Sequence, residues 1–222
     1  MPMTLADLAP RLELTLLRAD ATRADVEKLC ADACTHKLHG VVVSSSRVPL
    51  AAHLLEETDL KVCAAIGFPL GTADADAKRY EAEAAIDHGA QEIEVVLNHG
   101  WLKDGEAKAV LRELRDVVEA ADERPVKVLI ETSLLAPEFV VAGAQIAAEA
   151  EARFITLSGV FGTREISPDT IAKVKQAAGA SLGLKLFTHV TTLDAAQGLL
   201  DLGVQRLGVS ALPPNRAAGA GL

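Results

Sequence analysis

Residues 152–162 have the sequence ARFITLSGVFG. The run from Phe154 to Ser158 is apolar and β-branched, which predicts a buried strand, and the glycines at 159 and 162 indicate a loop directly after it. Segments of the same kind recur along the chain. We therefore expect the rest of the protein to surround the ends of such strands.

Strands of this type alternate with helical segments about eight times. The expected strands cover 12–17, 41–43, 61–66, 92–97, 126–132, 154–158, 182–187 and 206–210. The expected helices cover 22–37, 49–57, 72–89 (with Thr72 as its cap), 103–121, 137–150, a segment from Pro168 capped by Ser167, and 192–202. Continuous Val, Ile and Leu runs are typical of a parallel sheet covered by helices, which predicts a single-domain (β/α)8 TIM barrel over residues 1–222. A doubly wound open sheet is the alternative.

The charge, the cysteine content and the apolar runs of the chain indicate which partners and which cell compartment to expect. The chain has 22 Lys plus Arg against 31 Asp plus Glu, a net charge of −9, and no basic run, which argues against nucleic acid or anionic membranes as partners. Three cysteines without metal-type spacing indicate free thiols in a reducing compartment, and we expect no metal and no cofactor. The first residues do not resemble a signal peptide and no apolar run reaches membrane-spanning length. We expect a cytoplasmic protein with a small-molecule substrate.

Charged residues interrupt three strands that should otherwise be buried. They are Glu94 in EIEVVLN, Lys127 in VKVLIE and Lys185 in LGLKLF. Burying an unpaired ion costs several kcal/mol, so we expect these side chains to be partners. Chemistry in such barrels takes place at the C-terminal strand ends, and we expect these residues and Thr156 to point into the barrel mouth. The candidate substrate-binding residues there are Thr156, Ser158, Arg47, Glu131, Thr188, His189 and Ser210.

Seven stretches, in this order and spacing, resemble the deoxyribose-phosphate aldolase family: LELTLLRADAT, VPLAAHLL, KVCAAIGFPLG, GAQEIEVVLNHGWLKDGE, KVLIETSLL, FITLSGVFGT and GLKLFTHVTTLDAA. GFPLG and KVLIET are close to family-specific. The resemblance implies a (β/α)8 barrel, a reversible aldol cleavage through a lysine imine, and a possible homodimer.

Some functional positions of the family are matched in this chain and others are not. Lys185 matches the lysine that in the family lowers the pKa of the nucleophilic one, Lys127 matches the fifth-strand lysine, and Glu94 falls where the family has the aspartate of its proton relay. Thr156 stands in place of the Schiff-base lysine, and a threonine cannot form an imine.

Other family positions also differ. Val42 and Ser44 replace a cysteine and an asparagine, and residues 187–189 replace the glycines that bind phosphate. Ser210 alone remains of a serine pair, and the family's C-terminal tyrosine is missing, since Tyr80 lies on a predicted helix.

We therefore expect a divergent aldolase-like enzyme, of C–C lyase or condensation type, that acts on a small carbonyl or sugar-like substrate. Lys185 would serve as imine-forming amine or general acid and Glu94 would move protons. Ordinary cleavage of deoxyribose 5-phosphate is not expected. The alternatives are a non-imine elimination, isomerisation or condensation on a non-phosphorylated metabolite, and a catalytically silent ligand-binding barrel.

Each candidate residue also has a purely structural interpretation. Lys185 could form an ion pair with Glu94 or Glu131, and Lys127 could neutralise a carboxylate. Arg47 could clamp a substrate carboxylate or lie exposed at a helix start, and His189 could be a surface residue.

Overall fold

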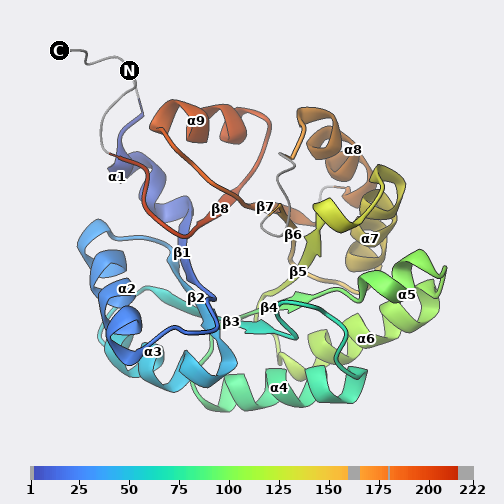
Figure 1. The fold of residues 1–222 in the computed structure, drawn as a ribbon, viewed down its shortest axis with the longest axis horizontal. Helices are drawn as coiled ribbons and strands as arrows, with labels where there is room; N and C mark the ends of the chain where they lie inside the picture. The colour runs from blue at the N-terminus through green and yellow to red at the C-terminus, as the bar shows by residue number, and fades with distance from the viewer. Residues whose placement is uncertain (1–2, 160–165, 180, 215–222) are drawn as a thin grey trace.

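Eight parallel strands close into a barrel in chain order, as Figure 1 shows. The computed structural model describes residues 3–159, 166–179 and 181–214. The strands are β1 (Leu12–Leu16), β2 (Gly40–Ser44), β3 (Lys61–Ile66), β4 (Glu92–Val96), β5 (Val126–Glu131), β6 (Phe154–Ser158), β7 (Gly183–Phe187) and β8 (Arg206–Val209). β8 pairs with β1, where Glu13 stands opposite Gly208. This pairing confirms the predicted barrel and excludes the open sheet.

Helices cover the outside of the barrel (Figure 1). They are α1 (Leu5–Leu8), α2 (Arg23–His36), α3 (Val48–Leu55), α4 (Ala75–Asp87), α5 (His99–Lys103), α6 (Ala107–Ala120), α7 (Pro137–Glu149), α8 (Pro168–Ala178) and α9 (Leu193–Asp201), with 3-10 turns η1 (Ala9–Arg11), η2 (Ser45–Arg47) and η3 (Thr132–Leu134). In the part of the chain that the structure describes, no helix has both the length and the apolarity needed to cross a membrane.

Side-chain caps decide where most of these helices begin. The predicted capping box at Thr22 is confirmed, and Ser167 accepts a hydrogen bond from the amide of Thr170 at the start of α8. The expectation that Thr72 caps α4 is wrong, because Asp74 accepts the amide of Asp76 and the helix begins at Ala75. An aspartate next to the first turn competes well for this position, since its carboxylate also suits the helix dipole.

Three details differ from the expected elements. The helix predicted over 103–121 is α6, which begins only at Ala107 because the chain turns at Gly105 with a φ of 80°. The short helix α5, which precedes that turn, was not expected. The short helix α1 was not expected, although Thr4 and Asp7 form a capping box there. The predicted loop after Ser158 lies outside the described residues from position 160, as does most of the predicted C-terminal tail.

Side chains on the strands alternate between two cores. One set, including Val41, Ile93, Val128 and Ile155, is buried between strands and helices. The other set faces the barrel interior, as the period of two along a strand requires. Most of the buried Val, Ile and Leu residues belong to the outer core. The charged residues of the strands belong to the set that faces the barrel interior.

The GFPLG loop after β3 generates a stability prediction. Gly71 has a φ of 70°, and a Cβ there would lie 2.3 Å from the Leu97 carbonyl oxygen, whereas Gly105 has a similar φ and open space around it. We expect Gly105→Ala to cost about 1–2 kcal/mol from backbone strain alone. Gly71→Ala should cost about 1–3 kcal/mol more, because it also forces two backbone segments apart. Urea unfolding of both variants measures this difference, and equal losses would contradict the close approach.

Candidate functional site

The interior of the barrel holds a cluster of six ionisable side chains from five strands. Its members are Glu13 of β1, Glu92 and Glu94 of β4, Lys127 of β5, Lys185 of β7 and Arg206 of β8. Glu92 and Glu94 share a face because they are two residues apart on one strand. The sequence predicted that Glu94, Lys127 and Lys185 would be partners of one another. Lys185 does pair with Glu94, whereas Lys127 pairs instead with Glu13 and Glu92.

Lys185 is held between two carboxylates. Its Nζ lies 2.5 Å from Glu13 Oε2 and 2.8 Å from Glu94 Oε1, and the side chain is fully buried. Burial alone would lower the pKa of Lys185, but the charges of Glu13 and Glu94 raise it above its ordinary value. The amine is therefore protonated at neutral pH, and an ammonium is not a nucleophile.

Lys127 bonds to Glu13 and Glu92, with its Nζ 2.7 Å from Glu13 Oε1 and 2.7 Å from Glu92 Oε2. Arg206 completes this part of the cluster through Nη1, 2.9 Å from Glu92 Oε2, and lies over the ring of Phe154. Burial would raise the pKa of Glu13, yet the two lysines hold it well below its usual range. Within the described cluster, three carboxylates thus face three cations.

Thr156 is a neutral member of this arrangement. Its hydroxyl donates to Glu94 Oε1 at 2.6 Å, and the side chain is fully buried. It pairs in register with Lys185 on the adjacent strand, so a lysine at 156 would place a second ammonium beside the first. With a neutral threonine at position 156, the three carboxylates and three cations of the cluster balance one another, and a lysine would add a fourth cation.

An apolar layer lies between the cluster and the barrel mouth. Val96, Leu129 and Phe187 are buried together, and Leu17 and Phe68 pack against them. Each of the first three stands two residues beyond Glu94, Lys127 or Lys185 on the same strand and face. The charged residues do face the barrel interior, but the expectation that they line its mouth is wrong, because this layer covers them.

A cavity of about 520 Å³ lies above the apolar layer. Its lining residues are Thr15, Leu16, Leu17, Arg18, Ala19, Ser44, Phe68, Pro69, Phe187 and Ser210. The guanidinium of Arg18 is shared by Asp20 and Asp25, at 2.6 and 2.9 Å. The remaining polar groups on the lining side chains are hydroxyls, so the cavity is an apolar chamber with a few hydrogen-bonding positions.

Glu131 and Ser158 lie together at the ends of adjacent strands. Ser158 Oγ donates to Glu131 Oε2 at 2.8 Å, and both side chains are buried. The backbone amide of Glu131 donates to His99 Nε2 at 2.9 Å. Arg47, by contrast, donates to the Ala21 carbonyl at 2.6 Å and is not among the residues that line the cavity.

Thr188, His189 and Ser210 do come together, in a pocket of about 220 Å³ beside the ends of β7 and β8. The amide of Thr188 donates to the Gly208 carbonyl at 3.2 Å, which continues the β7–β8 pairing by one residue. This amide is therefore not available to a ligand.

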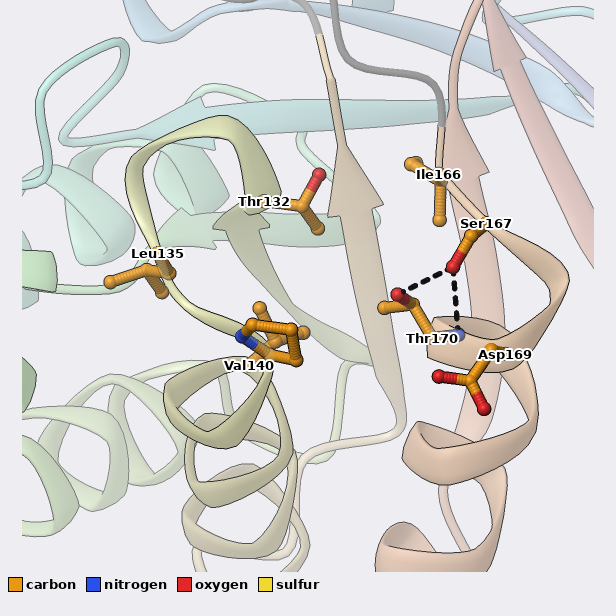
Figure 2. Close-up of a pocket in the computed structure, with 8 residues that line it drawn as sticks. Thr132, Leu135, Val140, Ile166, Ser167, Asp169 and Thr170 are labelled. Atoms are coloured by element: carbon orange, nitrogen blue, oxygen red, sulfur yellow. Dashed lines mark hydrogen bonds between the residues drawn. The ribbon is translucent and has the colours of Figure 1, made fainter.

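A further pocket, of about 200 Å³, lies between the end of β5 and the start of α8 (Figure 2). Its hydroxyls already have partners within the protein, since Ser167 accepts the amide of Thr170 and Thr132 donates to the Ser158 carbonyl. Figure 2 shows the Ser167–Thr170 contacts as dashed lines. Among the described lining residues the one charged side chain is Asp169, and it pairs with Lys173 at 2.8 Å.

Sequence reasoning missed two members of the cluster, Glu92 and Arg206, and did not identify Glu13 as a partner. It also missed His39, whose Nε2 lies 3.0 Å from Glu92 Oε1 at the edge of the cluster. Glu92 precedes Glu94 by two residues, and this spacing could have revealed it. Glu13, His39 and Glu92 offer atoms close enough to bind a metal ion together. However, oxygens of Glu13 and Glu92 already accept from Lys127 and Arg206, which an incoming metal ion would have to displace.

Comparison with known proteins identifies the family to which this barrel is related. Residues 11–179 match the family described as DeoC/LacD family aldolase. This chain belongs to that family. A deoxyribose-phosphate aldolase of Exiguobacterium sibiricum is 39% identical over 92% of this chain and 93% of its own length. One from a Geobacillus species is 38% identical over 92% of each chain.

Solved structures of the family agree with the barrel. The deoxyribose phosphate aldolase of Aeropyrum pernix superposes with a TM-score of 0.84 at 27% identity, covering 93% of this chain and 88% of that one. That protein is described as a tetramer. Homodimer formation by this chain stays a prediction.

The buried cluster makes Lys185 a structural residue whatever its further role. We expect Lys185→Met to lower the free energy of unfolding by about 3–5 kcal/mol, because it removes the cation that pairs with the buried Glu94 and one of the cations that pair with Glu13. Lys173→Met is the matched control, since Lys173 has a carboxylate partner at a similar distance, 2.8 Å, but is exposed. Urea unfolding should show a large loss for the first variant and little change for the second. A small loss for Lys185→Met would contradict the pairing.

His99 should make stability depend on pH. Burial lowers its pKa to about 4 from the ordinary 6.5, so between these values the unfolded chain binds a proton that the folded chain does not. The stabilisation is complete above about pH 6.5 and is lost as pH falls towards 4, by about 3 kcal/mol at most. His99→Asn should remove this slope from the pH profile of the unfolding free energy. The exposed His53 supplies the control, and a profile unchanged in His99→Asn would refute the assignment.

Proposed function

We propose that this member of the aldolase family acts on a small, non-phosphorylated carbonyl compound at the barrel mouth without forming a lysine imine. The observation that carries the proposal is the position of Lys185 between Glu13 and Glu94, with Thr156 on the neighbouring strand. The amine of Lys185 on β7 is protonated and lies beneath Phe187, and the β6 position has no amine.

Imine formation requires a free amine that can reach a carbonyl carbon. Lys185 satisfies neither condition, because its pKa is raised by two carboxylates and Phe187 lies between it and the cavity. Deprotonation of Lys185 would also be unfavourable because it removes the positive charge that pairs with the buried carboxylates of Glu13 and Glu94. Imine formation at Lys185, one of the two roles expected from the sequence, is therefore disfavoured on electrostatic and steric grounds.

Acid–base chemistry is the catalytic route that these residues support. In aldol cleavage a carboxylate takes the proton of the β-hydroxyl, and the bond between the α and β carbons breaks to release an aldehyde and an enolate. The enolate oxygen is stabilised by a hydrogen-bond donor until the α carbon takes the proton back. Glu94 Oε1 accepts from both Thr156 and Lys185, so the three groups already form a connected path for protons. Phe187 lies between this path and the cavity, so catalysis by this route requires that side chain to move from its position beneath the bound ligand.

A catalytically silent barrel is the second candidate. It is favoured by the apolar layer of Val96, Leu129 and Phe187, which separates the charged groups from the cavity. In this case the chain would bind its ligand in the cavity, and the ion cluster would serve only to hold the strands together.

We expect negligible cleavage of deoxyribose 5-phosphate by the purified protein. Loss of a covalent nucleophile costs on the order of a millionfold in kcat in other enzymes. A coupled assay for the aldehyde products measures turnover, and borohydride treatment with small aldehydes and ketones, followed by peptide mapping, detects any imine. Turnover at the level of the family's enzymes, or a reduced adduct on Lys185, would refute the proposal.

Two variants complete the test. Thr156→Lys should not restore the family's turnover, because it adds a fourth cation to the three carboxylates, and Thr156→Met serves as a control of similar size without the charge. Exchange of the α-protons of hydroxyacetone in D2O, followed by NMR, reports acid–base chemistry. Exchange that is lost in Glu94→Gln supports the enzyme, whereas no exchange in the unmodified protein favours the silent barrel.

A further inference from the structure

The walls of the mouth cavity differ from those of a sugar phosphate site. Leu17, Phe68 and Phe187 form its base, and Leu16, Ala19 and Pro69 add further apolar surface. Sugar phosphates have hydroxyls on almost every carbon, and each needs a hydrogen-bond partner when it leaves water. An apolar lining of this kind instead favours a ligand with a hydrocarbon body.

The charges around the cavity disfavour an anion. Among the described lining residues Arg18 is the one with a positive charge, and it already faces Asp20 and Asp25. An incoming phosphate would compete with both carboxylates and be repelled by them. The net charge of −9 adds a weak repulsion over the whole surface.

The adjacent pocket beside β7 and β8 does not supply a phosphate site either. Its described lining contains no lysine or arginine, and the amide of Thr188 is bonded to Gly208. The first turn of α9, next to this pocket in the chain, carries Asp194, which occupies the end of the helix dipole that would otherwise attract an anion.

The polar groups that remain fit a single carbonyl or hydroxyl. Thr15, Ser44 and Ser210 contribute hydroxyls to the cavity wall. Thr15 is buried, and within the described part of the chain its hydroxyl makes one long contact, 3.4 Å, to the Glu13 carbonyl. A hydroxyl can donate to a ligand carbonyl or accept from a ligand hydroxyl, and neither requires charge.

We propose that the mouth cavity binds an uncharged carbonyl compound with an apolar aromatic or branched aliphatic body. Its hydrocarbon part lies against Leu17, Phe68 and Phe187, and its oxygen faces the hydroxyls of Thr15, Ser44 or Ser210. The volume of about 520 Å³ is within the range of small-ligand sites. This assignment rests on the proposed function for the location of the site, and it names the class of substrate.

Binding of 4-fluoroacetophenone to the full chain, followed by 19F NMR, tests the assignment. We expect saturable binding that neither inorganic phosphate nor deoxyribose 5-phosphate displaces. Leu17→Asp should weaken it at least tenfold, because it places a carboxylate against the ligand body. Leu134→Asp is the matched control: Leu134 is an exposed leucine outside the cavity lining, and this variant should bind within twofold of the unmodified protein.

A second variant guards against misfolding of Leu17→Asp. Ala19 is exposed at the rim, so Ala19→Trp should fold normally, which circular dichroism checks, and should weaken binding at least tenfold by filling the cavity. Absence of saturable binding, displacement of the probe by phosphate, or equal affinity of the unmodified protein and Ala19→Trp would overturn the assignment. These readouts involve no turnover or imine trapping, so their failure is distinguishable from failure of the proposed function.

Discussion

The carboxylate of Glu13 is the contact on which the interior of this barrel depends. It accepts from Lys127 with one oxygen and from Lys185 with the other, in a space otherwise lined by small or apolar side chains. Desolvation of three carboxylates and three cations is costly, and the mutual pairing offsets that cost only while the numbers match. Each charged residue therefore constrains the identity of the others.

This constraint gives the threonine at position 156 a physical meaning. A lysine there would need either a free amine or a further carboxylate, and the described cluster supplies no additional acid. With threonine, Glu94 keeps a hydrogen-bond donor at 2.6 Å and its charge is available to Lys185. The same pairing that stabilises the strands converts Lys185 from the promoter of a nucleophile, as the family resemblance implies, into a fixed ammonium.

The apolar layer of Val96, Leu129 and Phe187 has a comparable effect on binding. It separates the ion cluster from water on the side of the mouth, which strengthens the ion pairs there. It also forms the base of the mouth cavity, where Phe187 stands in the segment that replaces the phosphate-binding glycines of the family. Stability of the cluster and the apolar character of the site thus have one structural origin.

The sequence by itself determined the barrel, because buried parallel strands require continuous Val, Ile and Leu runs and short crossovers through helices. It also identified Glu94, Lys127 and Lys185, since an ion within such a run must find a partner. The partners themselves were decided by the tertiary structure. Glu13 and Lys185 are 172 residues apart, and they meet only because β8 closes against β1. The depth of each side chain in the barrel depends on the stagger between strands, which no local pattern encodes. For that reason the sequence placed the charged residues at the mouth, whereas the structure buries them beneath an apolar layer.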